Sequence, residues 1–433
     1  MYSMSWAEEL ALKASREREA EVVELCSNLI KARSENPPGD VSAVVEVLRK
    51  WLGDRGIDSE VHDAGEGRLN LVSRIGSGRP LLVMNSHMDV VPAGDPSGWS
   101  FPPFCGDVKD GKVLGRGAAD TKSGLAAMAV ALDVLSDVEE KLRGTIVFTA
   151  VADEEVGGER GTGWLVRNVL PRADACIIGE PTGATHAVVG EKGICGLDLL
   201  GAGRTAHGST PMLGKNAVEL VFEAVERVKE LQSRLVPPPS ALEEAYENTR
   251  RFLRETAGKL GITGLDAERL ERVCETYTVN LGIIEGGFKR NVVPDRCRAE
   301  LDVRVPIGVS VEEAFQEVKK LAEAVEGVTC KLVARSEPNY TPPSEQICVA
   351  VYEAASKVLG RFGGFIVYSG ATDARFLRAA GTPTVIYGPG DHLKAHVQDE
   401  YVEVWRLRAS VGVYVLASLT YLTRGAVSYT HLT

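Results

Sequence analysis

The sequence predicts an α/β fold in two parts, a main domain with a mostly parallel sheet flanked by helices and a smaller inserted α+β sandwich. Short apolar segments alternate with helical segments through the first 190 residues, and this alternation returns after residue 341. Between these regions the pattern changes to strand, helix, strand, strand, helix, strand. A chain of 433 residues is long enough for two or three domains.

The main domain begins with two amphipathic helices, at 6–33 and 42–53, in which apolar residues recur at helical spacing. The segment Asn36-Pro37-Pro38-Gly39 breaks the chain between them. Alternating strands and helices follow. The predicted strands are 69–75, 81–85, 145–150 and 175–178, and the predicted helices are 122–136 and 161–169.

The pattern changes near Glu191, where the inserted sandwich begins. Its predicted strands are 194–201, 277–285, 295–305 and 328–334, and its helices are 217–231 and 311–324. An extra helical stretch at 240–273 follows three consecutive prolines. After Pro342-Pro343 we expect helix 345–360, strand 365–368, helix 373–380, strand 384–387 and helix 401–423.

These boundaries divide the chain into a first main-domain segment at 1–191, an inserted domain at 192–340 and a second main-domain segment at 341–425. Residues 426–433, AVSYTHLT, do not continue the preceding helical pattern and resemble translated adapter sequence. We expect this tail to be non-native and leave its His431 out of the site.

Composition narrows the class of protein. The net charge of −11 argues against a nucleic-acid partner, because phosphate binding needs clustered Lys and Arg. The eight cysteines include no C-x-x-C pair, which argues against a cysteine zinc site or a thioredoxin-like motif. Most of them lie in apolar surroundings, as expected of small core residues in a reducing compartment. The N-terminus lacks the apolar core of a signal peptide, and no apolar run is long enough to span a bilayer. We therefore expect a cytoplasmic protein without a membrane partner.

Candidate chemical residues follow several predicted strands. His87 and Asp89 come directly after an apolar strand and, two residues apart, share one face of an extended chain. A zinc-bound histidine usually needs a carboxylate behind its ring to fix its tautomer, and Asp89 is spaced to supply one. A capping Asp beside an unrelated His is the structural alternative.

Three further segments place acidic residues near the ends of predicted strands or the start of a predicted helix. Asp120 precedes a helix that begins near Lys122, although simple N-capping would also explain it. Glu154 and Glu155 follow a buried strand, and adjacent side chains diverge, so that one can bind metal while the other faces substrate. Glu180 follows another apolar strand.

His392 and His396 lie after the predicted strand 384–387. Their spacing of four would place both on one face of a helix, but we do not expect a helix here, and the spacing leaves the choice between them open. Together these residues supply imidazole and carboxylate ligands at strand ends of one α/β domain, where open sheets place their sites. Two histidines with carboxylates suit zinc or cobalt better than magnesium.

Seven segments resemble the M20 metallopeptidase family in their order and spacing, over residues 20–423. They are NSHMDVVP, GRGAADTKSG, ADEEVGG, GEPT, AHGSTPMLGKNA, SGATDARFL and GPG…AHVQDE. Glu180 in the GEPT segment favours the branch of acetylornithine deacetylases and succinyl-diaminopimelate desuccinylases.

The resemblance implies two Zn²⁺ ions, for which Co²⁺ or Mn²⁺ can substitute. It assigns metal ligands, a general base and a carboxylate behind His87, and its A-H-x-x-x-E context selects His396 over His392. The implied metal ligands are His87 and Glu180 for one ion, Glu155 and His396 for the other, and Asp120 as the bridge; Glu154 is the implied base and Asp89 the supporting carboxylate.

The resemblance also identifies the inserted domain as a lid that pairs two subunits into a homodimer, with His207 reaching the partner's active site to bind the developing oxyanion. Implied substrate contacts are Arg304, Asn291, Gly370 and Thr372. The structural alternative for Arg304 is an ion pair with Asp302 on a solvated sheet face. The stretch 240–273 and the turn Ser369-Gly370-Ala371-Thr372 depart from the family pattern, which makes the substrate harder to assign.

The implied activity is hydrolysis of the amide bond of a small N-acyl amino acid. Two metals would lower the pKa of a shared water molecule and so supply a hydroxide, while Glu154 would take the water's proton and deliver it to the leaving amine. A dipeptidase or carboxypeptidase of the same family is the alternative substrate class. A non-catalytic binding relative is the alternative of a different kind, but it would have lost Glu154 or a metal ligand, and all of them are present.

Overall fold

The computed structural model describes residues 5–170 and 172–428, the last five of these by their backbone alone. Its chain forms two compact units. The first contains residues up to 189, 341–365 and those from 372 onward, and the second contains 190–340 and 366–371. The expected domain borders lie within two residues of these, except that the short segment 366–371 groups with the second unit.

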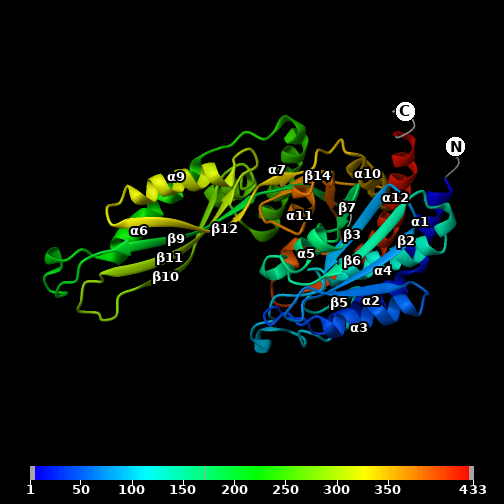
Figure 1. Ribbon diagram of the computed structural model, residues 1–433, viewed down its shortest axis with the longest axis horizontal. Helices are drawn as coiled ribbons and strands as arrows, with labels where there is room; N and C mark the ends of the chain where they lie inside the picture. Colours follow the sequence, from blue (N-terminus) through cyan, green and yellow to red (C-terminus); the bar gives the residue numbers. More distant parts are fainter. Residues whose placement is uncertain (1–4, 171, 429–433) are drawn as a thin grey trace. The chain divides into compact units, whose positions relative to one another are not determined.

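A nine-stranded mixed sheet has its central strands in the first unit (Figure 1). Its strands run in the order β1 (Ser59–Asp63), β2 (Leu69–Gly76), β6 (Thr145–Val151), β3 (Leu81–His87), β7 (Ala175–Ile178), β15 (Thr384–Ile386), β8 (Ala187–Glu191) and β13 (Asn339–Tyr340), with β14 (Phe365–Tyr368) paired to β8. The neighbours β6, β3, β7 and β15 are parallel to one another, whereas the pairs β1–β2, β2–β6, β15–β8 and β8–β13 are antiparallel. The sheet predicted to be mostly parallel is therefore mixed, with a run of four parallel strands at its centre.

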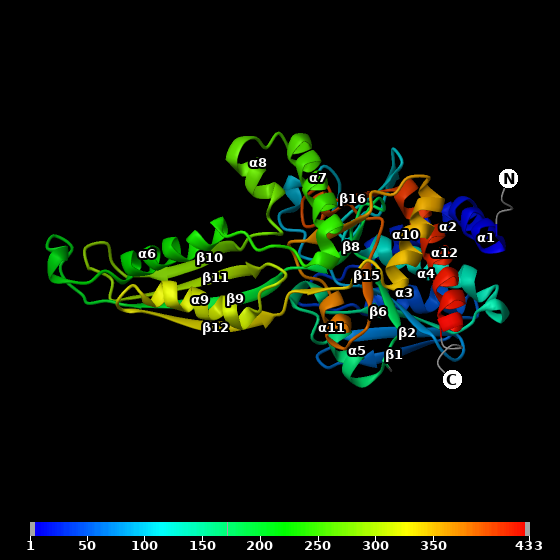
Figure 2. The ribbon, with the colours of Figure 1, turned by 90° about the horizontal axis from the view of Figure 1, so that it is seen from above.

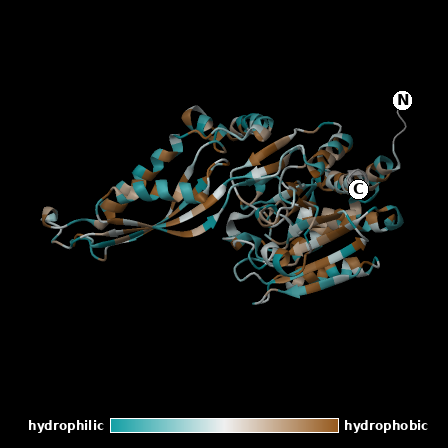
Figure 3. Cartoon of the chain, turned by 45° about the horizontal axis from the view of Figure 1, so that its top comes forward, coloured by the Kyte–Doolittle hydropathy of each residue, from teal (hydrophilic) through white to brown (hydrophobic). Residues whose placement is uncertain are grey.

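Burial explains why the central strands have continuous apolar sequences. Every residue of β3 and β7 is buried, as expected of parallel strands covered on both faces. Hydrophobic residues are frequent on the strands of the chain, whereas hydrophilic residues are frequent on the surfaces of its helices (Figure 3). The predicted strand 81–85 extends two residues further and ends at His87.

Helices flank this sheet (Figure 2). The helix α4 (Lys122–Ser136) is buried from Lys122 to Leu135 and packs against α2 (Glu19–Lys31) and α12 (Val404–Ser428). The predicted helix 6–33 is divided at Arg18 into α1 (Trp6–Glu17) and α2. The remaining helices are α3 (Ser42–Gly53), α5 (Thr162–Asn168), α10 (Gln346–Leu359) and α11 (Ala374–Ala379).

A three-stranded sheet joins two distant parts of the chain. Its order is β16 (Tyr401–Glu403), β5 (Lys112–Leu114) and β4 (Val108–Lys109), all antiparallel. These strands contain two or three residues each, too few to show an alternation in the sequence. The sheet nevertheless links the segment after His396 to the segment before Asp120.

The second unit contains a four-stranded antiparallel sheet in the order β10 (Thr278–Gly286), β11 (Arg296–Val305), β9 (Gly193–Ala202) and β12 (Val328–Ser336). Alternate residues of β9 and β11 are buried, against α6 (Ala217–Lys229) and α9 (Val311–Glu323). Ser310 and Glu313 form a capping box that begins α9. The predicted helical stretch 240–273 forms α7 (Glu243–Leu260) and α8 (Gly264–Glu271).

Three expectations bear on the chain as a whole. None of the helices within the described residues is long and apolar enough to cross a membrane. All eight cysteines are free, and seven of them are buried. Of the tail 426–433, residues 429–433, including His431, lie outside the described part of the chain, so its non-native origin stays a prediction.

Candidate metal centre

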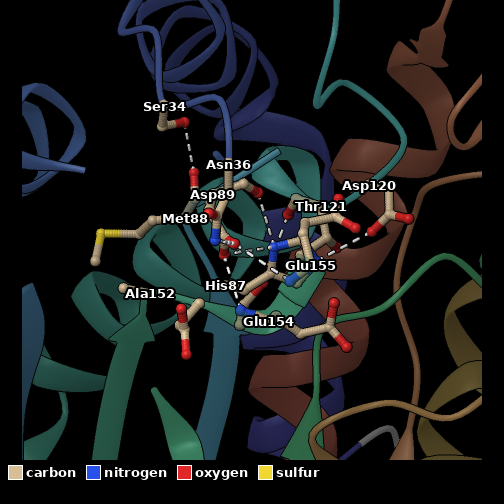
Figure 4. A network of polar contacts seen from close by, with 12 residues as sticks. Ser34, Asn36, His87, Met88, Asp89, Asp120, Thr121, Ala152, Glu154 and Glu155 are labelled. Carbon is tan, nitrogen blue, oxygen red and sulfur yellow. Dashed lines mark hydrogen bonds and ion pairs between the residues drawn. The ribbon is translucent and has the colours of Figure 1, made fainter. Parts of the chain in front are cut away.

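The candidate site gathers at the carboxyl ends of the central parallel strands. His87 is the last residue of β3, Glu154 and Glu155 follow β6, and Glu180 follows β7. Since parallel strands end at the same edge of a sheet, these side chains meet there, and Figure 4 shows His87, Glu154 and Glu155 together.

His87 is buried, and its ring is fixed from behind. Its Nδ1 lies 2.9 Å from the backbone carbonyl oxygen of Asp89 and 3.6 Å from the Asp89 carboxylate. A carbonyl can only accept, so Nδ1 carries the proton and Nε2 is the nitrogen left to bind a metal. The sequence predicted that the Asp89 carboxylate would hold the His87 ring. The backbone carbonyl of Asp89 makes that hydrogen bond instead, and the carboxylate lies farther away.

The Asp89 carboxylate has a different set of partners. It accepts from the backbone N–H of Glu154 at 3.1 Å, from that of Glu155 at 3.2 Å, and from Nδ2 of Asn36 at 2.8 Å. Burial opposes its ionisation, but the contact with His87 and these donors lower its pKa. Asp89 therefore holds the turn that carries both glutamates. Asn36 was missed in the sequence, where it appeared only as part of a Pro-Pro-Gly break.

Asp120 lies between two imidazoles. Its Oδ1 is 3.1 Å from Nε2 of His87, and its Oδ2 is 3.2 Å from Nε2 of His396. The carboxylate therefore does not cap α4, which was the structural alternative. One carboxylate with an oxygen toward each histidine has the geometry of a ligand that bridges two metal ions.

Each imidazole has a second carboxylate beside it. Glu180 Oε1 is 3.5 Å from Nε2 of His87, and Glu155 Oε2 is 3.1 Å from Nε2 of His396. His392 faces Asp391 instead, with Nδ1 3.8 Å from Oδ1. Its short 3-10 turn ends at Lys394, and His396 has a left-handed backbone with φ of 62°, so the two histidines do not share a helical face.

Glu154 lies close to His87 and Glu180 but forms no ion pair with either histidine among the contacts of the described residues. One of its oxygens lies within 4.8 Å of ligand atoms of His87 and Glu180. Burial, and then the nearby carboxylates of Asp373 and Glu155, raise its pKa well above the ordinary value. This glutamate therefore holds a proton more readily than an ordinary glutamate does.

The remaining groups show how much negative charge is buried here. Burial raises the pKa of Glu180 well above the usual range, and hydrogen bonds to Asp120 and Glu155 raise that of His396 to about 10. Protons on the histidines thus compensate the carboxylates. Divalent cations would do the same, and imidazole nitrogens with carboxylate oxygens are the ligands that Zn²⁺ and Co²⁺ accept. The side chains fit a pair of such ions.

Asp373 is a buried acid that the sequence did not single out. Burial raises its pKa to about 6, and its Oδ2 accepts from Oγ1 of Thr162 at 2.7 Å. It directly follows Thr372, whose Oγ1 accepts from the backbone of Ala374 at the start of α11. Its position beside a predicted substrate contact was the available signal.

The other predicted contacts lie in the second unit. His207 is exposed, with Nδ1 2.7 Å from Oγ of Ser209, and the next residue, Gly208, donates its N–H to the Asn291 carbonyl at 2.8 Å. The His207 and Asn291 loops are therefore neighbours. Gly370 belongs to this unit as well, whereas Thr372 belongs to the first.

Arg304 lies elsewhere on the second unit, on β11. Its Nε is 3.0 Å from both carboxylate oxygens of Asp302, and a terminal nitrogen is 3.0 Å from Oδ2. This is the Arg304–Asp302 ion pair that the structural alternative predicted. A role in substrate binding requires the guanidinium to share or exchange that partner.

Known proteins resemble this chain over most of its length. Residues 83–420 match the sequence model of peptidase family M20/M25/M40. A probable succinyl-diaminopimelate desuccinylase of Staphylococcus aureus (strain MRSA252) is 29% identical over 412 residues, which cover 93% of this chain and 98% of the relative. An acetylornithine deacetylase of Proteus mirabilis (strain HI4320) is 28% identical over 370 residues, covering 84% and 85%.

A solved structure has the same fold. An M20 family metallo-carboxypeptidase from Sulfolobus solfataricus superimposes with a TM-score of 0.77 at 20% identity, covering 93% of this chain and 99% of that one. With the family match extending through both units, the chain belongs to peptidase family M20/M25/M40 and is a metal-dependent hydrolase.

Proposed function

We propose that this protein hydrolyses the amide bond of small N-acyl amino acids, as a deacetylase or desuccinylase, with two zinc ions. The observation that carries the proposal is the Asp120 carboxylate, with one oxygen toward His87 and the other toward His396. The names of the two relatives above support the substrate class. The eight free cysteines support a cytoplasmic location.

Two sets of side chains would hold the metals. His87, Glu180 and Asp120 would hold one ion, and His396, Glu155 and Asp120 the other, with Co²⁺ or Mn²⁺ as substitutes for Zn²⁺. When bound, such a pair lowers the pKa of a water molecule toward neutrality and polarises the substrate carbonyl.

Glu154 would be the general base. It is buried, its pKa is raised, and it lies beside the histidine and carboxylate ligands without pairing to an imidazole. A glutamate in this condition takes a proton from the attacking water and returns it to the departing amine. The hydrogen bond from its own N–H to Asp89 holds the residue in register with the ligands.

We also propose that the second unit pairs two subunits, with His207 serving the partner's site. Apolar side chains are exposed on the loops near His207, with Met212 and Phe288 each 77% exposed. Gly208, next to His207, and Gly287, next to Phe288, line the same hollow. The two loops therefore lie on one surface. Exposed apolar side chains gathered in this way are typical of protein interfaces.

Hydrolysis of N-acetyl and N-succinyl amino acids tests the proposal directly. We expect the zinc- or cobalt-loaded protein to release amino acid from these substrates faster than from dipeptides, and chelation to abolish the release. Faster cleavage of dipeptides would favour the peptidase alternative. Full activity in protein that elemental analysis proves free of metal would exclude the metal-dependent mechanism.

Glu154→Gln and Glu155→Gln separate the base from a ligand. The first should lower kcat by about 10²–10⁴-fold, the usual contribution of general base catalysis, with metal content near wild type. The second should lower the metal content, because Glu155 faces His396. Loss of metal with retained turnover in Glu154→Gln would mean that the two roles are exchanged.

Arg304→Ala tests carboxylate recognition, with Asp302→Asn as its matched control. A guanidinium binds an α-carboxylate through two hydrogen bonds. Its loss should therefore raise KM for a free-acid substrate at least about tenfold more than for the amide analogue, a difference of about 1.4 kcal/mol. Asp302→Asn should leave this preference intact. Equal losses on both analogues, or equal effects of both substitutions, would leave Arg304 as a structural ion pair.

A mixture of two inactive variants tests the shared site. His207→Ala and Glu154→Ala homodimers should each be inactive and should regain activity after subunit exchange. One site in the hybrid then combines an intact Glu154 with the other subunit's intact His207. No recovery after demonstrated exchange would contradict a role for His207 in the partner's site.

A further inference from the structure

A buried ion pair lies directly beside the candidate metal centre, within the first unit. Glu400 is completely buried, and its Oε1 accepts from the backbone N–H of Ala119 at 2.8 Å and from that of Asp120 at 3.0 Å. Its Oε2 accepts from Nη1 of Arg116 at 2.5 Å. The carboxylate is thus occupied on both oxygens, and one oxygen holds the backbone of the bridging ligand.

Arg116 connects this carboxylate to the segment of His396. The same Nη1 also donates to the carbonyl oxygen of Val397 at 3.1 Å, and the guanidinium lies 5.1 Å from the centre of the Trp99 ring. The backbone N–H of Gly115 donates to the Glu400 carbonyl at 2.9 Å. Side chain and backbone therefore bind the segment before Asp120 to the segment after His396.

We propose that Glu400 and Arg116 are positioning residues that set the separation of Asp120 and His396 and so determine the affinity for metal. This inference depends on the proposed function, in which both residues are ligands. Oδ2 of Asp120 and Nε2 of His396 are 3.2 Å apart, although they come from distant parts of the sequence. Neither segment is regular structure at the ligand itself, so the separation depends on the contacts that join them.

The chemistry of Glu400 makes it hard to replace. A buried carboxylate is stable only when its oxygens are satisfied, and here two backbone donors and a guanidinium do so. In Glu400→Gln, one of the two oxygens becomes an NH₂ group that faces either Arg116 or the N–H groups of Ala119 and Asp120. Two donors then oppose each other, and the loop loses its fixed position.

The experiment is a metal titration of Glu400→Gln, with metal-free protein and Zn²⁺ or Co²⁺ added alone. Residues that hold metal ligands from behind typically contribute about 10–100-fold to affinity, and we expect a loss of this size. The visible spectrum of the Co²⁺ form should also change, because it depends on ligand arrangement. Glu400→Asp, which keeps the charge but is one methylene shorter, should give a smaller loss and carries the same test if Glu400→Gln does not fold.

Asp133→Asn is the matched control. Asp133 is a buried acid on α4, paired with Arg18 and lying 3.5 Å from Nε of Arg55, and it holds no ligand segment. The Asp133→Asn substitution should lower the melting temperature without changing the metal affinity or the Co²⁺ spectrum. Glu400 variants with wild-type affinity and spectrum, whatever their melting temperature, would overturn the positioning role. Wild-type protein that binds neither ion would instead overturn the proposed function, which the Glu400 variants by themselves cannot do.

Discussion

The Asp120 carboxylate is shared between two imidazoles, and the rest of the site is arranged around that contact. One oxygen faces His87 at the end of β3, and the other faces His396 in the C-terminal part of the chain. Three separate segments must therefore arrive within hydrogen-bond distance of one another. Each requires its own support, which the Asp89, Glu400 and Arg116 contacts supply.

Buried negative charge is the cost of this arrangement. Asp120, Glu154, Glu155 and Glu180 share a small volume, and burial raises the pKa of the three glutamates. Asp120 differs, because hydrogen bonds from His396 and His87 outweigh its burial and lower its pKa. The pKa of the residue between the two histidines is thus lowered, while those of Glu154 and Glu180 are raised well above the ordinary value. This difference among neighbouring carboxylates is what a bridging ligand and a general base require.

The sheet topology explains why these groups meet. β6, β3 and β7 are parallel neighbours, so residues that immediately follow them are placed at one edge. The antiparallel outer strands widen the sheet without contributing to that edge. His396 reaches it by another route, through an irregular segment fastened by β16 and β5. The backbone at Asp153 and His396, with φ of 72° and 62°, lies in the left-handed region, which is often found at functional sites.

The sequence by itself determined most of the regular elements and the chemical types of the candidate ligands. β7 and α4 have the predicted bounds because their apolar residues are consecutive in the chain, and local pattern reports burial of this kind. The candidate histidines and acids could also be identified from the sequence, because each follows a recognisable strand or lies in a motif. The family motifs also selected His396 over His392, which spacing could not do.

Only the tertiary structure decided which atoms support those ligands. The hydrogen bond behind His87 comes from the Asp89 backbone, while the Asp89 carboxylate turns to Asn36 and the two glutamates. The Asn36, Glu400 and Asp373 contacts, and the short β16–β5 pairing, join segments far apart in the sequence and leave no periodic signal. The pairing of Arg304 with Asp302 was equally undecided, because a strand pattern shows which residues share a face but not which partner an arginine takes. Secondary structure depends mainly on residues that are neighbours in the sequence. The position of a candidate ligand depends on contacts that form only when the chain has folded.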